Sequence, residues 1–223
     1  MYTAYRVKEA MKINGKLDKN AWKKAPKSPR FVDMISGGPA LYDTRSAVLW
    51  DNCYLYVGFW LEEPFVTAEL KERDEPLFSE NNIEFFIDGV DTYYELEINA
   101  LNTIYEAFFI WKDAYKRGGK FDVPEFDVHQ NKVSTFQGYY ETDNQFWEGT
   151  HPRGIRWAFR NWDFPGLQTG VHVNGKLNDH TKVDQGWSVE LALPWEGMKW
   201  LANGRSLLFL GIPGSFSLGD LRS

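Results

Sequence analysis

Cysteine is almost absent from this chain of 223 residues, and so are runs of basic residues. It has a single cysteine, Cys53, so no disulfide can form within the chain. The 25 Lys and Arg residues are outnumbered by 31 Asp and Glu residues, which gives a net charge of −6. Binding to a phosphate backbone requires a basic surface, so this composition argues against nucleic acid as a partner. The four histidines also lack the spacing that is typical of metal sites.

Long apolar runs are missing as well. The longest, such as residues 207–210, span only a few positions, so no membrane-spanning helix is expected. The N-terminal residues contain no apolar stretch of signal-peptide length. This pattern is compatible with a cytoplasmic protein or with one whose leader has been removed.

Helix signals are few. Asp18 is a candidate N-cap for a short helix over residues 19–25, which Pro26 would end. Pro194 is placed to begin a second helix over residues 195–201.

Alternation with a period of two dominates the rest and predicts strands. The expected strands cover residues 45–51, 54–61, 82–88, 93–101, 104–112 and 187–193. Asp51 and Asn52 suit the turn between the first two. Many short strands and little helix indicate an all-β fold, an antiparallel β-sandwich formed by one domain over residues 1–223.

Two segments depart from this regular pattern. Residues 113–164 are polar, aromatic and glycine-rich, and we interpret them as a long loop insertion with short strands of its own. Residues 203–223 form an atypical C-terminal tail. If closing strands were missing there, one sheet edge would lack a partner, which proteins normally avoid.

Aromatic residues make up 17% of the chain, including ten Trp. Their rings bury large areas in a β-sandwich core, and they also offer flat apolar faces. Such faces complement the C–H faces of sugar rings. The large number of aromatic residues is therefore compatible with core packing or with sugar binding.

Several motifs in a fixed order resemble the family 9 carbohydrate-binding modules. The resemblance covers roughly residues 10 to 202. The chain resembles the stand-alone members of that family more than the modules that are fused to enzymes. The matching stretches are residues 13–18 with Ala21 and Trp22, 48–51 with 54–57, 62–64, 83–88, 93–102 and 186–195.

The resemblance implies a non-catalytic sandwich that binds a saccharide, found outside the cytoplasm. In the family, two Trp rings clamp a sugar end and polar groups bond its hydroxyls. Phe78 occupies the place of the first clamp ring, and Glu84 and Asn99 match polar positions that contact sugar. Some members have Arg where this chain has Glu97, which inverts the charge at that position.

The second clamp ring has no direct counterpart, so it would come from the insertion or its border. The candidates are Trp111, Trp147, Trp157 and Trp162. Family members also use calcium ions to brace loops. Asp88 and Asp91 flank a turn with the hard oxygen ligands that calcium prefers, and Asp122, Glu125 and Asp127 offer a second such group.

Two other functions remain open at this point. Glu95 and Glu97 lie on one strand face about 7 Å apart, within the range of roughly 5–9.5 Å that separates the two acids of glycoside hydrolases. The sandwich also resembles haem-binding domains of redox proteins, for which Met34 and His172 would be the axial ligands.

Overall fold

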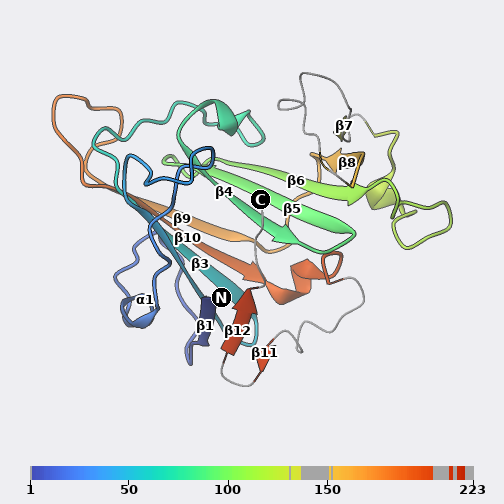
Figure 1. The fold of residues 1–223 in the computed structure, drawn as a ribbon, viewed down its shortest axis with the longest axis horizontal. Coiled ribbons are helices and arrows are strands. Elements are labelled where there is room, and N and C mark those ends of the chain that lie inside the picture. The colour runs from blue at the N-terminus through green and yellow to red at the C-terminus, as the bar shows by residue number, and fades with distance from the viewer. Residues whose placement is uncertain are drawn as a thin grey trace.

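Two β-sheets face each other in the computed structural model, which describes residues 2–130, 132–136, 151, 153–202, 211–212 and 215–218. The described strands of the larger sheet follow the order β11-β12-β1-β2-β3-β10-β9. Those of the smaller sheet follow the order β4-β5-β6-β8-β7 (Figure 1). The expectation of an all-β fold is confirmed.

The larger sheet is formed by seven described strands. They are β1 (Tyr2–Arg6), β2 (Thr44–Trp50), β3 (Tyr54–Leu61), β9 (Gln168–Asn174), β10 (Gly186–Pro194), β11 (Gly211–Ile212) and β12 (Ser215–Leu218). All its described pairs are antiparallel except β1 with β2, which is parallel. Within the C-terminal tail, β12 pairs with β1 and so extends the sheet beyond that strand.

The smaller sheet is formed by five described strands, all antiparallel. They are β4 (Asn82–Asp88), β5 (Thr92–Asn99), β6 (Ile104–Trp111), β7 (Val133–Phe136) and β8 (Arg156–Phe159). The predicted insertion does carry short strands, because β7 and β8 lie within it. They are not separate from the fold, since β8 pairs with β6 in the same sheet.

Helix is as scarce as the sequence predicts. The only described α-helix is α1 (Asn20–Lys24), and its N-cap is Lys19, which makes no side-chain capping bond. The prediction that Asp18 caps it is therefore wrong. The segment after Pro194 forms a short 3-10 turn, η3 (Trp195–Met198), rather than an α-helix. Two further 3-10 turns are η1 (Leu77–Ser79) and η2 (Pro124–Phe126).

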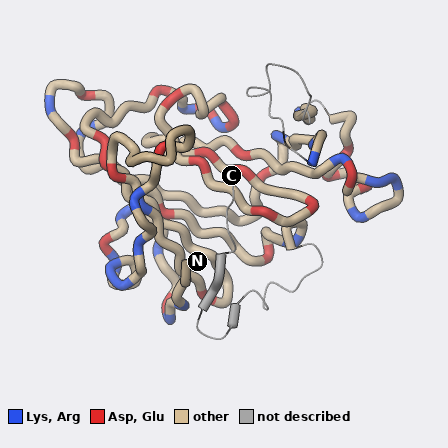
Figure 2. Tube along the Cα trace, in the orientation of Figure 1, with Lys and Arg blue, Asp and Glu red and all other residues tan. Residues whose placement is uncertain are grey.

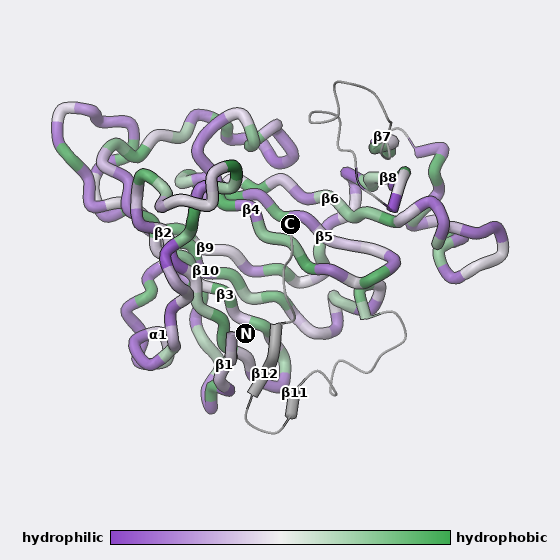
Figure 3. The backbone as a smooth tube through the Cα atoms, in the orientation of Figure 1, coloured by the Kyte–Doolittle hydropathy of each residue, from purple (hydrophilic) through white to green (hydrophobic). Residues whose placement is uncertain are grey.

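The core lies between the sheets and is built largely from aromatic rings. Phe59 of β3 meets Phe85 of β4 edge to face, with ring centroids 6.4 Å apart. Phe108 and Phe126 stack at 5.1 Å, and Trp162 lies 4.6 Å from Phe108. In Figure 3, apolar stretches coincide with the strands and polar stretches with the loops around them. Much of the aromatic excess therefore serves packing.

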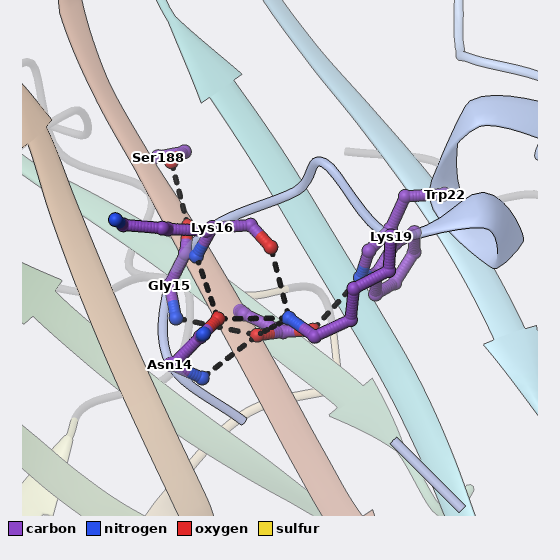
Figure 4. A network of polar contacts seen from close by, with 7 residues as sticks. Asn14, Gly15, Lys16, Lys19, Trp22 and Ser188 are labelled. Carbon is purple, nitrogen blue, oxygen red and sulfur yellow. Dashed lines mark hydrogen bonds and ion pairs between the residues drawn. The ribbon is translucent and has the colours of Figure 1, made fainter. Parts of the chain in front are cut away.

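The outer face of the larger sheet is covered in part by residues 13–19, which we call the N-terminal arm, together with α1. Glu190 of β10 is fully buried beneath them. Its carboxylate accepts hydrogen bonds from the backbone N–H groups of Asn14 and Gly15 at 2.9 and 3.2 Å. It also accepts one from Trp22 Nε1 at 2.8 Å and pairs with Lys19 Nζ at 2.8 Å (Figure 4).

Small residues leave room for this cover. A Cβ atom on Gly170 would lie 2.5 Å from the backbone nitrogen of Gly15, and one on Gly58 would lie 3.1 Å from the Leu17 side chain. Two stretches that carry the family resemblance, the arm and β10, thus meet around Glu190. The contacts around Glu190 attach the N-terminal arm to the sheet.

Candidate functional site

The outer face of the smaller sheet gathers most of the polar residues that the sequence singles out. Alternation along each strand places one row of side chains on this face and the next row in the core. The outward row of β4 holds Asn82, Glu84, Phe86 and Asp88, and that of β5 holds Tyr93, Glu95, Glu97 and Asn99. Acidic positions along these strands are visible in Figure 2.

Three carboxylates form the centre of this face. Glu84 is exposed and lies directly across from Glu97 in the β4–β5 ladder. Glu95 lies two residues before Glu97 on the same face. Glu97 is only 2% exposed, and Asn82 Nδ2 donates to its Oε2 at 3.3 Å. Neighbouring strands thus bring together acids that are distant in the sequence.

Burial and mutual repulsion favour the protonated form of two of these acids. Desolvation, together with the charge of Glu84, raises the pKa of Glu95 to about 7. Desolvation and the charges of Glu95 and Glu84 raise the pKa of Glu97 to about 8, against a smaller opposing effect of the Phe78 backbone N–H. Near neutral pH these groups therefore exchange protons readily and can both donate and accept hydrogen bonds.

An aromatic ladder adjoins the acids. Tyr93 of β5 and Phe109 of β6 stack with centroids 4.2 Å apart and planes 6° from parallel, and Trp111 lies 5.9 Å from Tyr93. Arg156 of β8 lies 5.4 Å from the Trp111 ring centre, and its Nε donates to the Tyr93 hydroxyl at 2.5 Å. One end of the face is acidic, and the other combines rings with a guanidinium group.

Two phenylalanine rings are exposed beside the acids. Phe86 is 40% exposed and lies across from Glu95 in the ladder. Phe78, in η1, is 68% exposed, and its backbone N–H lies near Glu97. Sequence reasoning identified Phe78 and missed Phe86, although the alternation of β4 placed Phe86 on the same side as Glu84.

Asn99 is on the expected face but is fully buried. Its Nδ2 donates to Leu70 O at 2.8 Å and to Glu80 Oε1 at 2.6 Å. Its Oδ1 accepts from the backbone N–H groups of Leu101 and Thr103, both at 3.0 Å. Both ends of the amide are therefore engaged in holding the β5–β6 turn and the loop over residues 62–81.

That loop, which carries Phe78, is also fixed by an ion pair whose acid is buried and whose arginine is partly exposed. Arg73 pairs with Glu106, which is fully buried on the core side of β6, and with Asp163 at 2.7 Å. Glu106 also accepts hydrogen bonds from the Tyr94 hydroxyl and from the backbone N–H of Phe164. The position of Phe78 therefore depends on both sheet strands and the insertion.

The expected calcium turn contains groups that already have partners. Asp88 Oδ1 accepts from Val90 N at 2.8 Å, and Asp91 Oδ1 pairs with Arg153 at 3.0 Å. Glu125, from the second acidic group, accepts from the indole nitrogens of Trp162 and Trp200. Within the described part of the chain, no three His, Cys, Asp or Glu side chains gather as a metal-ligand set.

The candidate rings for a second clamp have different locations. Trp111 lies on the outer face, 6% exposed, with His151 4.5 Å away. Trp162 is buried in the core, and Trp157 lies on β8 and packs against the core. Trp147 is outside the described residues. Of the described tryptophans, none is exposed, so a stacking ring is better supplied by Phe78 or Phe86.

The two residues considered for haem lie in different parts of the fold. Met34 is 90% exposed in the turn that follows Val32, and His172 is half-buried on β9 of the larger sheet. No described helix has the length and apolar character needed to cross a bilayer.

No family model matches the chain, and a search of curated proteins finds no match.

Proposed function

We propose that this protein binds a saccharide without modifying it, on the outer face of the smaller sheet. The observation that carries the proposal is the cluster of Glu84, Glu95 and Glu97 between exposed phenylalanine rings. Sugar sites combine ring faces that stack on the pyranose with polar groups that bond its hydroxyls. The resemblance of the sequence to family 9 modules points in the same direction.

The acids suit hydroxyl groups. A sugar hydroxyl donates one hydrogen bond and accepts two, so its best partner also does both. Glu84 is exposed, while the pKa values of Glu95 and Glu97, about 7 and about 8, keep a proton available near neutral pH. Glu95, which is half-buried, can therefore donate to one hydroxyl oxygen while Glu84 accepts from another. Glu97 is only 2% exposed and lies too deep to bond the ligand itself.

The rings supply the stacking surface. Phe86 projects from the same strand face as Glu84, and Phe78 lies in the loop next to Glu97. Arg73 and Asn99 hold this loop in place, so the Phe78 side of the site is fixed before a ligand arrives. Pre-organisation of this kind lowers the entropy lost on binding.

A glycan array probed with the purified chain, with and without calcium, tests the proposal. We expect hits whose affinity falls about tenfold or more in Phe86→Ala, because stacking area is lost. Tyr5→Ala is the matched control, since Tyr5 is 51% exposed on β1 of the other sheet. A folded protein without hits, or hits that Phe86→Ala leaves unchanged, would contradict the proposal.

A second candidate function is glycoside hydrolysis. It is favoured by the raised pKa of Glu95, about 7, because a general acid must hold its proton near neutral pH. Release of product from an aryl glycoside that stops in Glu95→Gln would support it. Recovery of an unchanged sugar after binding would favour the non-catalytic function.

A further inference from the structure

A groove of ≈ 620 Å³ lies on the opposite side of the molecule, on the outer face of the larger sheet. A row of cross-strand neighbours runs along its floor: His172 of β9, Ser188 of β10, Trp60 of β3 and Arg45 of β2. Its walls are formed by the N-terminal arm, by Lys27 and by the ends of β9 and β10. The volume is within the range of small-molecule sites.

The floor and one wall are fixed. Trp60 meets Trp22 edge to face, with centroids 6.1 Å apart and an angle of 87°. The Ser188 hydroxyl donates to Gly15 O at 2.7 Å. Gly15 lies in the N-terminal arm and Trp22 in α1, and Glu190 bonds both residues, so the groove does not depend on a loose loop.

The acids of the groove are mostly engaged, while two of its cations are not. Both carboxylate oxygens of Asp43 accept from Arg45 Nε at 3.0 Å, and Glu62 accepts from the backbone N–H of Asp43. By contrast, Lys16 and Lys27 form no ion pair with any described residue. Asp18 is the remaining acid of the lining.

Lys27 is placed to hold an anion above an aromatic ring. Its Nζ lies 3.9 Å from the centre of the Trp60 ring. Partial burial is the main cause that lowers the pKa of Lys27; the charge of Arg45 adds to this effect and that of Asp43 opposes it. In Figure 2, basic residues also gather around α1, beside this groove.

Side chains that can bond the hydroxyl groups of a ligand line the other end of the groove. Asn174 and Gln185 bond each other at 2.6 Å and retain further donor and acceptor capacity. The His172 side chain makes no hydrogen bond to any residue that the structure describes, although it lies half-buried in the floor. The groove therefore combines the Trp60 ring, the Lys27 ammonium group above it, and neutral polar side chains on the neighbouring strands and the adjoining loop.

We propose that this groove binds a sugar acid, with the carboxylate of the ligand paired to Lys27 and its hydroxyls bonded by His172, Asn174 and Gln185. The ring would lie along Trp60. The site is separate from the face that carries Glu84, so it does not rest on the function proposed above.

Calorimetric titration with glucuronate and galacturonate tests the inference, with glucose and acetate as matched ligands. We expect a uronate to bind about tenfold or more tightly than glucose, which lacks the carboxylate, or acetate, which lacks the ring. Lys27→Met should weaken uronate binding by a similar factor. Lys23→Met, an exposed lysine of α1 outside the groove, should leave it unchanged.

Lys27 is exposed, so its replacement is not expected to prevent folding. The inference is overturned if neither uronate binds the folded protein, if acetate binds as tightly, or if Lys27→Met binds the uronate as the unaltered protein does.

Discussion

Replacing Glu190 by alanine would remove the group that holds the N-terminal arm to the larger sheet. The carboxylate accepts from four donors: the backbone N–H groups of Asn14 and Gly15, Lys19 Nζ and Trp22 Nε1. In Glu190→Ala, Lys19 Nζ keeps two other acceptors, Asn14 Oδ1 and Lys16 O. The Gly15 and Trp22 donors lose their acceptor in buried contacts, where water cannot easily replace it.

The magnitude follows from these contacts. A buried donor left without an acceptor costs about 1–3 kcal/mol, and two such donors are left here. The lost ion pair adds less than the roughly 3–5 kcal/mol of a fully buried pair, because the Lys19 side chain is 21% exposed. Since these contributions overlap, we expect the free energy of unfolding to fall by about 4 kcal/mol. For a chain of this size, that corresponds to a decrease in Tm of roughly 8–16 °C.

Urea unfolding followed by tryptophan fluorescence and circular dichroism measures this change. Glu196→Ala is the control, because Glu196 is an exposed acid just beyond β10 and its loss should cost less than about 0.5 kcal/mol. Combining Glu190→Ala with Lys19→Met should cost less than the sum of the single changes, because the two groups form one ion pair. A loss below about 1 kcal/mol in Glu190→Ala would refute this reasoning.

Three further predictions concern stability. The pKa of Glu97, about 8, is above its ordinary value of 4.5, so the folded state binds the proton more tightly than the unfolded chain does. The stability gained in this way is present below pH 4.5 and is lost as the pH rises through 8. Glu97→Gln should therefore become more stable relative to the unaltered protein as the pH rises between these two values. Urea midpoints of the two proteins that show no such trend would contradict this prediction. Gly170→Ala should cost more than Gly58→Ala, about 3 against about 1 kcal/mol. The Cβ of Gly170→Ala would lie 2.5 Å from backbone of the arm, whereas that of Gly58→Ala would lie 3.1 Å from the Leu17 side chain. Equal urea midpoints for the two variants would show that the arm shifts to make room. Arg73→Met should cost about 3 kcal/mol by leaving Glu106 buried and without its cation, and an unchanged melting temperature would argue against that pair.

The strands with clear alternation could be predicted closely from the sequence. The strands expected over residues 54–61 and 82–88 have the same bounds as the observed β3 and β4. Each of these strands has one face in the core, which produces the alternation that the sequence shows. The short strands β7 and β8 could not be placed, because their pairing depends on β6 rather than on their own pattern. The same is true of β1, whose partners β2 and β12 come from distant parts of the chain.

The site was predicted in part. Alternation correctly put Glu84, Glu95 and Glu97 on one face, but it says nothing about which polar groups find partners. Asn99 has its amide engaged by Leu70, Glu80 and the following turn, contacts that only the folded loop creates. Alternation along β10 puts Glu190 on the outer face of its sheet, but the covering arm buries it.

The most direct test of saccharide binding on the outer face of the smaller sheet is a calorimetric titration with one sugar that the protein binds. The unaltered protein and Glu84→Gln are compared. Glu84 is exposed, so its replacement should leave the fold intact. The account predicts saturable binding, weakened about tenfold or more in Glu84→Gln, with the sugar recovered unchanged. Equal affinities for the two proteins would mean that the sugar binds elsewhere, and the proposed site would be wrong.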